Sequence, residues 1–283
     1  MINRIWSFIK DIVSRFIEDD ILSAGAQATF YMLLSLFPFL IFVITLVSYT
    51  PILDFKDNAE IFATLMPKNA YTIVTDIIEQ TVNSRSSTLL SFGMIFTLWS
   101  SSSGVSALIR GINRAYDQEE KRPYWRLVGL SLYFTLELVA VIFLSLILIV
   151  FGRIMGSHFF VFLGFSDLFV SIWNSVRNII AYIAIIVVFI SLYRKAPNRK
   201  IRFKEAIPGA IFASVAWVFI SLGFSYYANN LGNYTKVYGS LGGIIVLMMW
   251  IYLSIIMILI GAEINASRIY SKYGQIKEKI KKF

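Results

Sequence analysis

The chain has 283 residues, of which 57% are hydrophobic, and its mean hydropathy is +0.70. One water-soluble core of this size cannot bury so many apolar side chains, so we expect a membrane to act as the solvent. Cysteine is absent, which excludes disulfides, thiolate metal sites and a cysteine nucleophile. The net charge of +9 leaves nucleic acid and membrane lipid as partners to weigh, and the positions of the basic residues decide between them.

The N-terminal segment interleaves charged and apolar residues, so it lacks the continuous apolar region of a cleavable signal. Its apolar residues between Ile5 and Ile17 recur at helical spacing, opposite charged residues such as Lys10 and Arg15. We therefore expect residues 1–24 to hold an amphipathic helix in the cytoplasmic membrane interface.

Six later stretches are long and apolar enough to cross a bilayer, for which a helix needs about 20 residues. They predict an all-α, polytopic membrane protein in which about six transmembrane helices form a single domain, residues 25–265. The connection 50–88 is predicted to be extracytoplasmic and to hold a second amphipathic helix, and residues 266–283 to form a basic cytoplasmic tail. The short apolar run Phe159–Val170 is interpreted as an external or re-entrant piece. The expected spans are residues 25–49, 89–112, 127–151, 171–193, 206–228 and 240–264.

Most lysines and arginines fall before the first span, in the second–third and fourth–fifth connections, and in the tail. The positive-inside rule therefore predicts a multi-pass protein with both termini cytoplasmic. Juxtamembrane basic clusters of this kind attract anionic lipids, and no zinc, recognition-helix or RNA-binding motif accompanies them. We expect membrane lipids, including anionic lipids at the cytoplasmic face, as partners, and no nucleic acid.

Polar residues inside apolar spans are costly and therefore mark candidate sites. In the first span Pro38 predicts a kink, because it has no N–H to donate. In the second span a serine run, Ser100–Ser103, is followed by a polar face that ends at Arg110; it predicts either close helix packing or a polar groove. The candidate substrate-path residues are Gln27, Tyr31, Ser35, Pro38, Trp99, Ser100, Ser103, Ser106, Arg110, Asn113, Arg114, Glu137, Arg177, Tyr238, Glu263 and Asn265.

Glu137 is the one carboxylate deep within a span, where a charge must be protonated, paired or hydrated. Arg177 and Asn178 are candidate partners, and a structural pair and a proton or cation site both remain open. Glu263 lies at the same predicted depth as Arg110, which predicts a salt bridge between the second and sixth spans. We predict no catalytic residue, no metal ligand and no cofactor.

Several motifs follow one another along the chain: Ala28–Pro38, Trp99–Gly104 leading to Asn113–Tyr116, Pro208–Ala210, Tyr238–Gly242 and Gly261–Ala266. Together they resemble the YihY/BrkB family of bacterial inner-membrane proteins, and the resemblance covers nearly the whole chain. It implies a cytoplasmic (inner) membrane protein of about six spans. Some members carry an old ribonuclease BN label and others a virulence-factor label; transport of ions or lipids has been suggested, and the family supplies no catalytic residues to carry over.

Transport of a lipid or another amphipathic substrate is the function we expect first, without a nucleotide-binding motif of the chain's own to drive it. One alternative is a cation/proton antiporter that titrates Glu137, and another is a non-transporting envelope scaffold. A nuclease is disfavoured, because the one histidine, His158, lies on the predicted external side and the short cytoplasmic acidic runs are typical of solvated helix ends. Homo-oligomers and envelope partner proteins are left open.

Overall fold

A computed structural model describes residues 2–49, 87–154, 167–230 and 241–273. Throughout these ranges the regular structure is helical, with no strand. Long apolar sequences favour helices in a bilayer because a helix satisfies all of its backbone hydrogen bonds internally. The helices are α1 (Ile2–Glu18), α2 (Ile21–Tyr49), α5 (Ser87–Ala115), α6 (Tyr124–Ile154), α8 (Asp167–Lys195), α9 (Phe203–Asn230) and α11 (Leu241–Tyr273).

Each of the six expected spans overlaps one of the helices from α2 to α11. Among the described residues two segments, Phe203–Tyr227 and Gly242–Lys272, are long and apolar enough to cross a membrane. The count of six spans therefore stays a prediction. Helix α11 continues to Tyr273, so the start of the predicted tail is helical and Ala266 in it is buried. The predicted helix within residues 50–88, the short run Phe159–Val170 up to residue 166, and Tyr238 lie outside the described residues.

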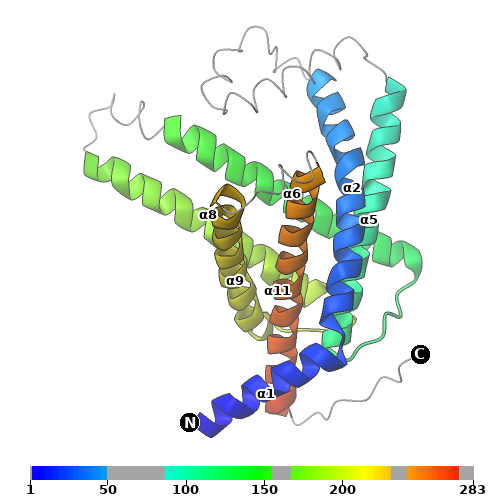
Figure 1. The fold of residues 1–283 in the computed structure, drawn as a ribbon, viewed down its shortest axis with the longest axis vertical. Helices are drawn as coiled ribbons and strands as arrows, with labels where there is room; N and C mark the ends of the chain where they lie inside the picture. Colours follow the sequence, from blue (N-terminus) through cyan, green and yellow to red (C-terminus); the bar gives the residue numbers. More distant parts are fainter. Residues whose placement is uncertain (1, 50–86, 155–166, 231–240, 274–283) are drawn as a thin grey trace.

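Three antiparallel helix pairs make up the bundle (Figure 1). Helices α2 and α5 lie side by side, and α9 and α11 form a second pair next to them. Helices α6 and α8 form the third pair, which runs obliquely to the other two and contacts α5 and α9. Helix α1 lies across the end of the bundle where α5 and α11 finish, which we call the α1 end.

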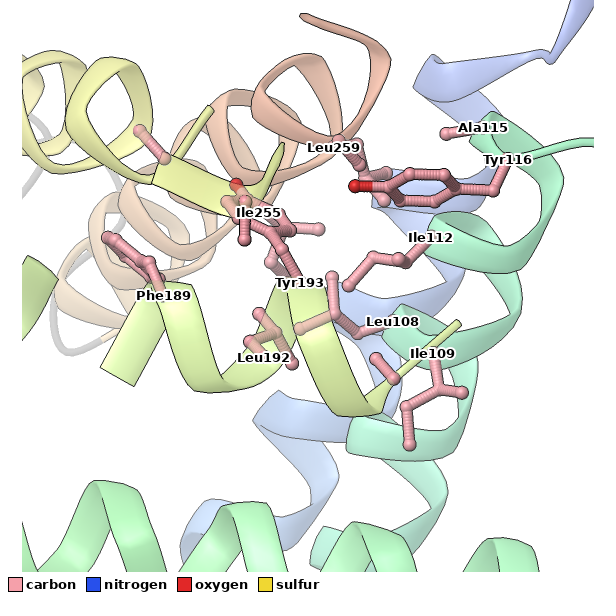
Figure 2. Packing of buried hydrophobic residues seen from close by; sticks show 14 of the residues in the cluster. Leu108, Ile109, Ile112, Ala115, Tyr116, Phe189, Leu192, Tyr193, Ile255 and Leu259 are labelled. Atoms are coloured by element: carbon pink, nitrogen blue, oxygen red, sulfur yellow. The ribbon is translucent and has the colours of Figure 1, made fainter. Parts of the chain in front are cut away.

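The helices meet near the α1 end in one apolar core (Figure 2). Tyr193 of α8 is fully buried there, and its hydroxyl donates to the carbonyl of Ile258 in α11 at 2.7 Å. The hydrogen bond satisfies a polar group that would otherwise be costly to bury. The labelled core residues are Leu108, Ile109, Ile112, Ala115, Tyr116, Phe189, Leu192, Tyr193, Ile255 and Leu259.

Helices α9 and α11 cross through two glycines, Gly209 and Gly261. A Cβ atom on Gly209 would lie 2.0 Å from the carbonyl oxygen of Gly261, so only glycine allows this approach. Pro208 precedes the crossing and interrupts the hydrogen bonding of α9, because it has no N–H. Asn265 of α11 bonds to the backbone on both sides of the proline: it accepts from the Gly209 N–H at 2.7 Å and donates to the Ala206 carbonyl at 3.1 Å. The two glycines therefore allow α9 and α11 to approach closely, and Asn265 hydrogen-bonds the two helices together beside Pro208.

The end of α5 is closed by an aspartate in the left-handed region, Asp117, whose φ is 51°. The Gln118 N–H donates to the Asn113 carbonyl and the Asp117 N–H to the Arg114 carbonyl, both at 2.9 Å. This is the Schellman pattern, in which glycine is the usual residue at the left-handed position. Aspartate tolerates that conformation better than most residues, and here it turns a carboxylate back toward α1.

We expect Gly209→Ala to destabilise the protein by about 1–3 kcal/mol, because the added methyl group overpacks the α9–α11 crossing. Thermal unfolding of purified protein in detergent measures the effect. Gly223→Ala, in the same helix, is the matched control, because a Cβ atom there meets nothing within 4 Å. Equal melting temperatures for the two variants would contradict the packing role of Gly209.

Candidate functional site

Arg15 of α1 is buried at the α1 end among three carboxylates. Its Nε donates to Asp11 at 3.1 Å, and its Nη1 lies 3.8 Å from Asp117 and 3.9 Å from Glu263. Its guanidinium also lies over the ring of Tyr270, 4.9 Å from the centroid. Because Glu263 is completely buried, the cation beside it offsets part of the cost of burying its charge. We call Asp11, Arg15, Asp117 and Glu263 the Arg15 cluster.

The Arg15 cluster holds α1 to the bundle by the charged face of that helix. Burial alone would lower the pKa of Arg15, but the surrounding carboxylates outweigh it and raise that pKa above its ordinary value. Arg15 is therefore a permanent cation. Asp11 also accepts a hydrogen bond from Ser267 of α11. The opposite face of α1 stays exposed and apolar, with Trp6, Val13 and Ile17 among its residues.

The predicted salt bridge between Glu263 and Arg110 is wrong. Arg110 is exposed and directs its charge away from the core that contains its neighbour Ile109. Glu263 lies instead beside Arg15, which comes from α1 at the other end of the sequence. Nothing in the local pattern around Glu263 indicates a partner so distant in the chain.

A second network joins the two connections at the α1 end. The Asn113 side chain donates to Glu120 at 2.7 Å and accepts from the backbone N–H of Asn198 at 2.6 Å. Glu120 also accepts two side-chain hydrogen bonds from Arg122, at 2.6 and 2.7 Å, and Arg122 donates to the Ala196 carbonyl at 2.6 Å. The α5–α6 connection is therefore fastened to the α8–α9 connection.

Glu120 is the titrating member of this second network. Burial alone would raise its pKa, but hydrogen bonds from the side chain and backbone of Arg122 outweigh burial and lower the pKa below its ordinary value. A lowered pKa means that the folded protein favours the carboxylate, so this contribution to stability is lost as pH falls.

The serine run of α5 belongs to helix packing. Ser100 donates to the Phe96 carbonyl at 2.7 Å, and Ser103 donates to the Trp99 carbonyl at 3.2 Å. The next residue, Gly104, approaches α2 so closely that a Cβ atom would lie 3.0 Å from the backbone nitrogen of Met32. Of the two interpretations left open for this run, the contacts favour close packing over a polar groove.

Ser106 continues this role between α5 and α6. Its hydroxyl lies 2.7 Å from that of Ser131, which in turn donates to the Leu127 carbonyl at 2.8 Å. Both serines are buried. The pair is therefore a hydrogen bond between two helices and forms no open path.

The remaining candidate residues do not converge on one site. Gln27 and Trp99 are exposed, and Tyr31 and Ser35 are half-buried. Arg114 is exposed and donates to the Asp19 carbonyl at 3.0 Å. Helix α2 continues through residue 38, and residue 177 lies in α8, but the side chains of Pro38 and Arg177 are outside the described part. Asn113, Glu263 and Asn265 are buried in the networks described above.

Glu137 lies in a different polar feature, between α6 and α8. Ser191 of α8 donates to the Glu137 carboxylate at 2.9 Å. One turn away, the Lys195 ammonium contacts the Tyr133 hydroxyl and lies 4.1 Å from the centroid of its ring. We call Tyr133, Glu137, Ser191 and Lys195 the α6–α8 seam.

The seam differs from the Arg15 cluster in its exposure. Glu137 and Ser191 are half-buried, Tyr133 is 40% exposed, and Lys195 is exposed. Sequence reasoning identified Glu137 as a charge within an apolar run, but not Ser191 or Lys195. Their spacing of four residues in α8 matches that of Tyr133 and Glu137 in α6, which is the signal that could have found them.

Across the ranges that the structure describes, no group of three or more His, Cys, Asp or Glu side chains is placed to hold a metal ion. The carboxylates of the Arg15 cluster surround a guanidinium, and Glu137 pairs with a serine. What these groups offer chemically is hydrogen bonding and charge.

We expect Arg15→Gln to lower the stability by about 3–5 kcal/mol, because it leaves the buried carboxylates without their cation. Arg110→Gln is the matched control, since Arg110 is exposed and has no such contact. Thermal unfolding of both variants measures the difference. Adding Glu263→Gln to Arg15→Gln should recover part of the loss. A double variant with the summed loss of the two single variants would contradict direct coupling.

We expect the Glu120→Gln variant to lose less stability than the wild type on acidification. Ionised Glu120 contributes its full stabilisation above the ordinary carboxyl pKa of about 4.3. This stabilisation is lost as pH falls through the lowered pKa of Glu120 in the folded protein. Melting temperatures measured from pH 7 to pH 3 test this. Parallel curves for the two proteins would show that Glu120 does not carry the acid sensitivity.

Comparison with known proteins identifies the relatives of the chain. A family model described as Virulence factor BrkB matches residues 12–282. A putative ribonuclease-like protein, YfkH, of Bacillus subtilis is 43% identical over 260 residues, which cover 92% of this chain and 94% of that protein. A UPF0761 membrane protein of Aliivibrio fischeri is 26% identical over 273 residues, covering 93% of this chain and 83% of the relative.

Another UPF0761 membrane protein, of Idiomarina loihiensis, is 29% identical over 269 residues, covering 94% of this chain and 92% of the relative. No solved structure matches the chain. The resemblance inferred from the motifs is confirmed by the family match over nearly the whole length. The chain therefore belongs to the BrkB family and is an integral membrane protein of the bacterial UPF0761 type.

Proposed function

We propose that this protein moves a lipid or another amphipathic molecule across the bacterial cytoplasmic membrane, with the polar part of the substrate passing along the α6–α8 seam. The observation that carries the proposal is the half-open position of the seam. Its four polar side chains follow one another between two helices and are not enclosed in the core.

The carboxylates Glu137 and Glu263 differ in their burial and in their partners. Glu263 is completely buried beside Arg15, as expected of a structural ion pair. Glu137 is only half-buried, has a serine hydroxyl as its hydrogen-bond donor and makes no salt bridge within the described residues. A carboxylate in that position, within an apolar helix, needs a further polar partner or water. A passing headgroup supplies such a partner while its acyl chains stay in the lipid.

The energy source follows from the motifs. The chain has no G-x-x-x-x-G-K phosphate-binding loop, so we propose movement that is passive or coupled to an ion gradient. The antiporter alternative uses the same Glu137, but a site for a small ion is best enclosed from lipid, and the seam is open at its side. Ribonuclease chemistry has no support from the side chains of either polar feature, and we propose that the protein is not an enzyme.

Reconstitution tests the proposal. Purified protein is incorporated into liposomes that contain a phospholipid with a fluorophore on one acyl chain, and a membrane-impermeant reductant bleaches the label in the outer leaflet. We expect the protein to expose label from the inner leaflet faster than protein-free liposomes do. Tyr133→Leu combined with Ser191→Ala removes two polar groups of the seam; at about 1 kcal/mol for each hydrogen bond, a rate loss of about tenfold or more is expected.

Ser100→Ala is the control variant, because Ser100 bonds to a carbonyl of its own helix and lies outside the seam. Wild-type protein that bleaches no faster than empty liposomes would overturn the proposal and leave the scaffold alternative. Collapse of an imposed pH gradient, sensitive to Glu137→Gln and without lipid movement, would support the antiporter instead.

A further inference from the structure

The α6–α8 seam carries a positive charge, Lys195, and a negative charge, Glu137, at different positions along the helix pair. Lys195 contacts Tyr133, and Glu137 contacts Ser191. Tyr133 and Glu137 are four residues apart in α6, a rise of about 6 Å along the helix. The positive charge therefore lies about one turn nearer the α1 end than the negative charge, and the two do not form a salt bridge with each other.

Each charge keeps capacity to bind a ligand. The Lys195 ammonium has three N–H donors, and its described contacts are with the hydroxyl and ring of Tyr133. The Glu137 carboxylate accepts one hydrogen bond through Oε2, from Ser191, and a carboxylate has about four acceptor positions. A ligand with an anionic and a cationic group a few ångströms apart would complement both.

On the basis of the proposed function, we propose that the seam selects phospholipids whose headgroup carries both a phosphate and a primary amine, the ethanolamine class. The phosphate binds Lys195 and the ammonium binds Glu137. A headgroup that is anionic only, such as glycerol phosphate, brings the same phosphate to Lys195, but only neutral hydroxyl groups and no cation to the carboxylate of Glu137. The charge-assisted hydrogen bond between an ammonium and Glu137, which a hydroxyl cannot form, is what discriminates between the two classes.

The amine is expected to be primary for a second reason. Its N–H groups can donate to the carboxylate of Glu137 and to the hydroxyls of Ser191 and Tyr133. A quaternary ammonium has no N–H, and proteins bind it mainly through cages of aromatic rings. The seam offers one ring, that of Tyr133, and Lys195 already lies over it. A choline headgroup therefore fits less well.

The experiment compares three acyl-labelled phospholipids with unmodified ethanolamine, choline and glycerol headgroups in the same liposome assay. For the wild type we expect the ethanolamine lipid to move about tenfold faster than the glycerol lipid, with choline between or below them. Glu137→Gln should abolish the preference by slowing the ethanolamine lipid to the rate of the glycerol lipid. Lys195→Gln should slow all three lipids, whereas Lys204→Gln, an exposed lysine at the start of α9, should not.

The outcomes separate this inference from the proposed function. Movement of all three lipids at one rate by the wild type would overturn the headgroup inference and leave the proposed function standing. If no lipid moves, the proposed function fails, and competition between ethanolamine and glycerol lipids for the detergent-solubilised protein still tests the inference. A binding preference for ethanolamine that Glu137→Gln removes would support it, and equal binding would overturn it. Unchanged thermal unfolding of Glu137→Gln establishes that the variant is folded.

Discussion

The organisation of this protein depends on one buried cation. Arg15 lies between carboxylates from three parts of the chain: its own helix, the turn after α5, and α11. A buried charge is stable only when it is paired, so each of these segments requires the others in place. The left-handed conformation of Asp117 has a structural consequence here, because it returns the chain at the end of α5 so that the carboxylate faces Arg15.

Around this cluster, hydrogen bonds join the connections between helices at the α1 end. Asn113 and Glu120 join the loops after α5 and α8, while Asn265 joins α11 to the backbone of α9 on both sides of Pro208. The seam between α6 and α8 is built differently, from half-buried side chains in a helix pair that runs obliquely to the rest (Figure 1). A closed end and a half-open side seam suit a protein whose substrate enters from the lipid, and Glu137 would be the charge that such a substrate meets.

Much of the fold could be predicted because long apolar runs predict membrane helices. The motifs were sufficient to identify the family. Glu137 was identified for the same reason, as a charge within an apolar run. Partners were harder to predict: the pair of Arg15 and Glu263 joins opposite ends of the sequence, and no local pattern encodes it. The serines of α5 left two interpretations open, because a hydroxyl that bonds to its own helix and one that lines a groove look alike in sequence.

The central claim is that polar groups of a substrate, and therefore water, have access to the seam within the membrane. Because the chain contains no cysteine, a single Ser191→Cys substitution can report on this directly in proteoliposomes. A thiol reacts with a water-soluble maleimide as the thiolate, which does not form in hydrocarbon. We expect Ser191→Cys to react, and Ser131→Cys, completely buried between α5 and α6, to remain unreactive. Equal lack of reaction at both positions would contradict the account.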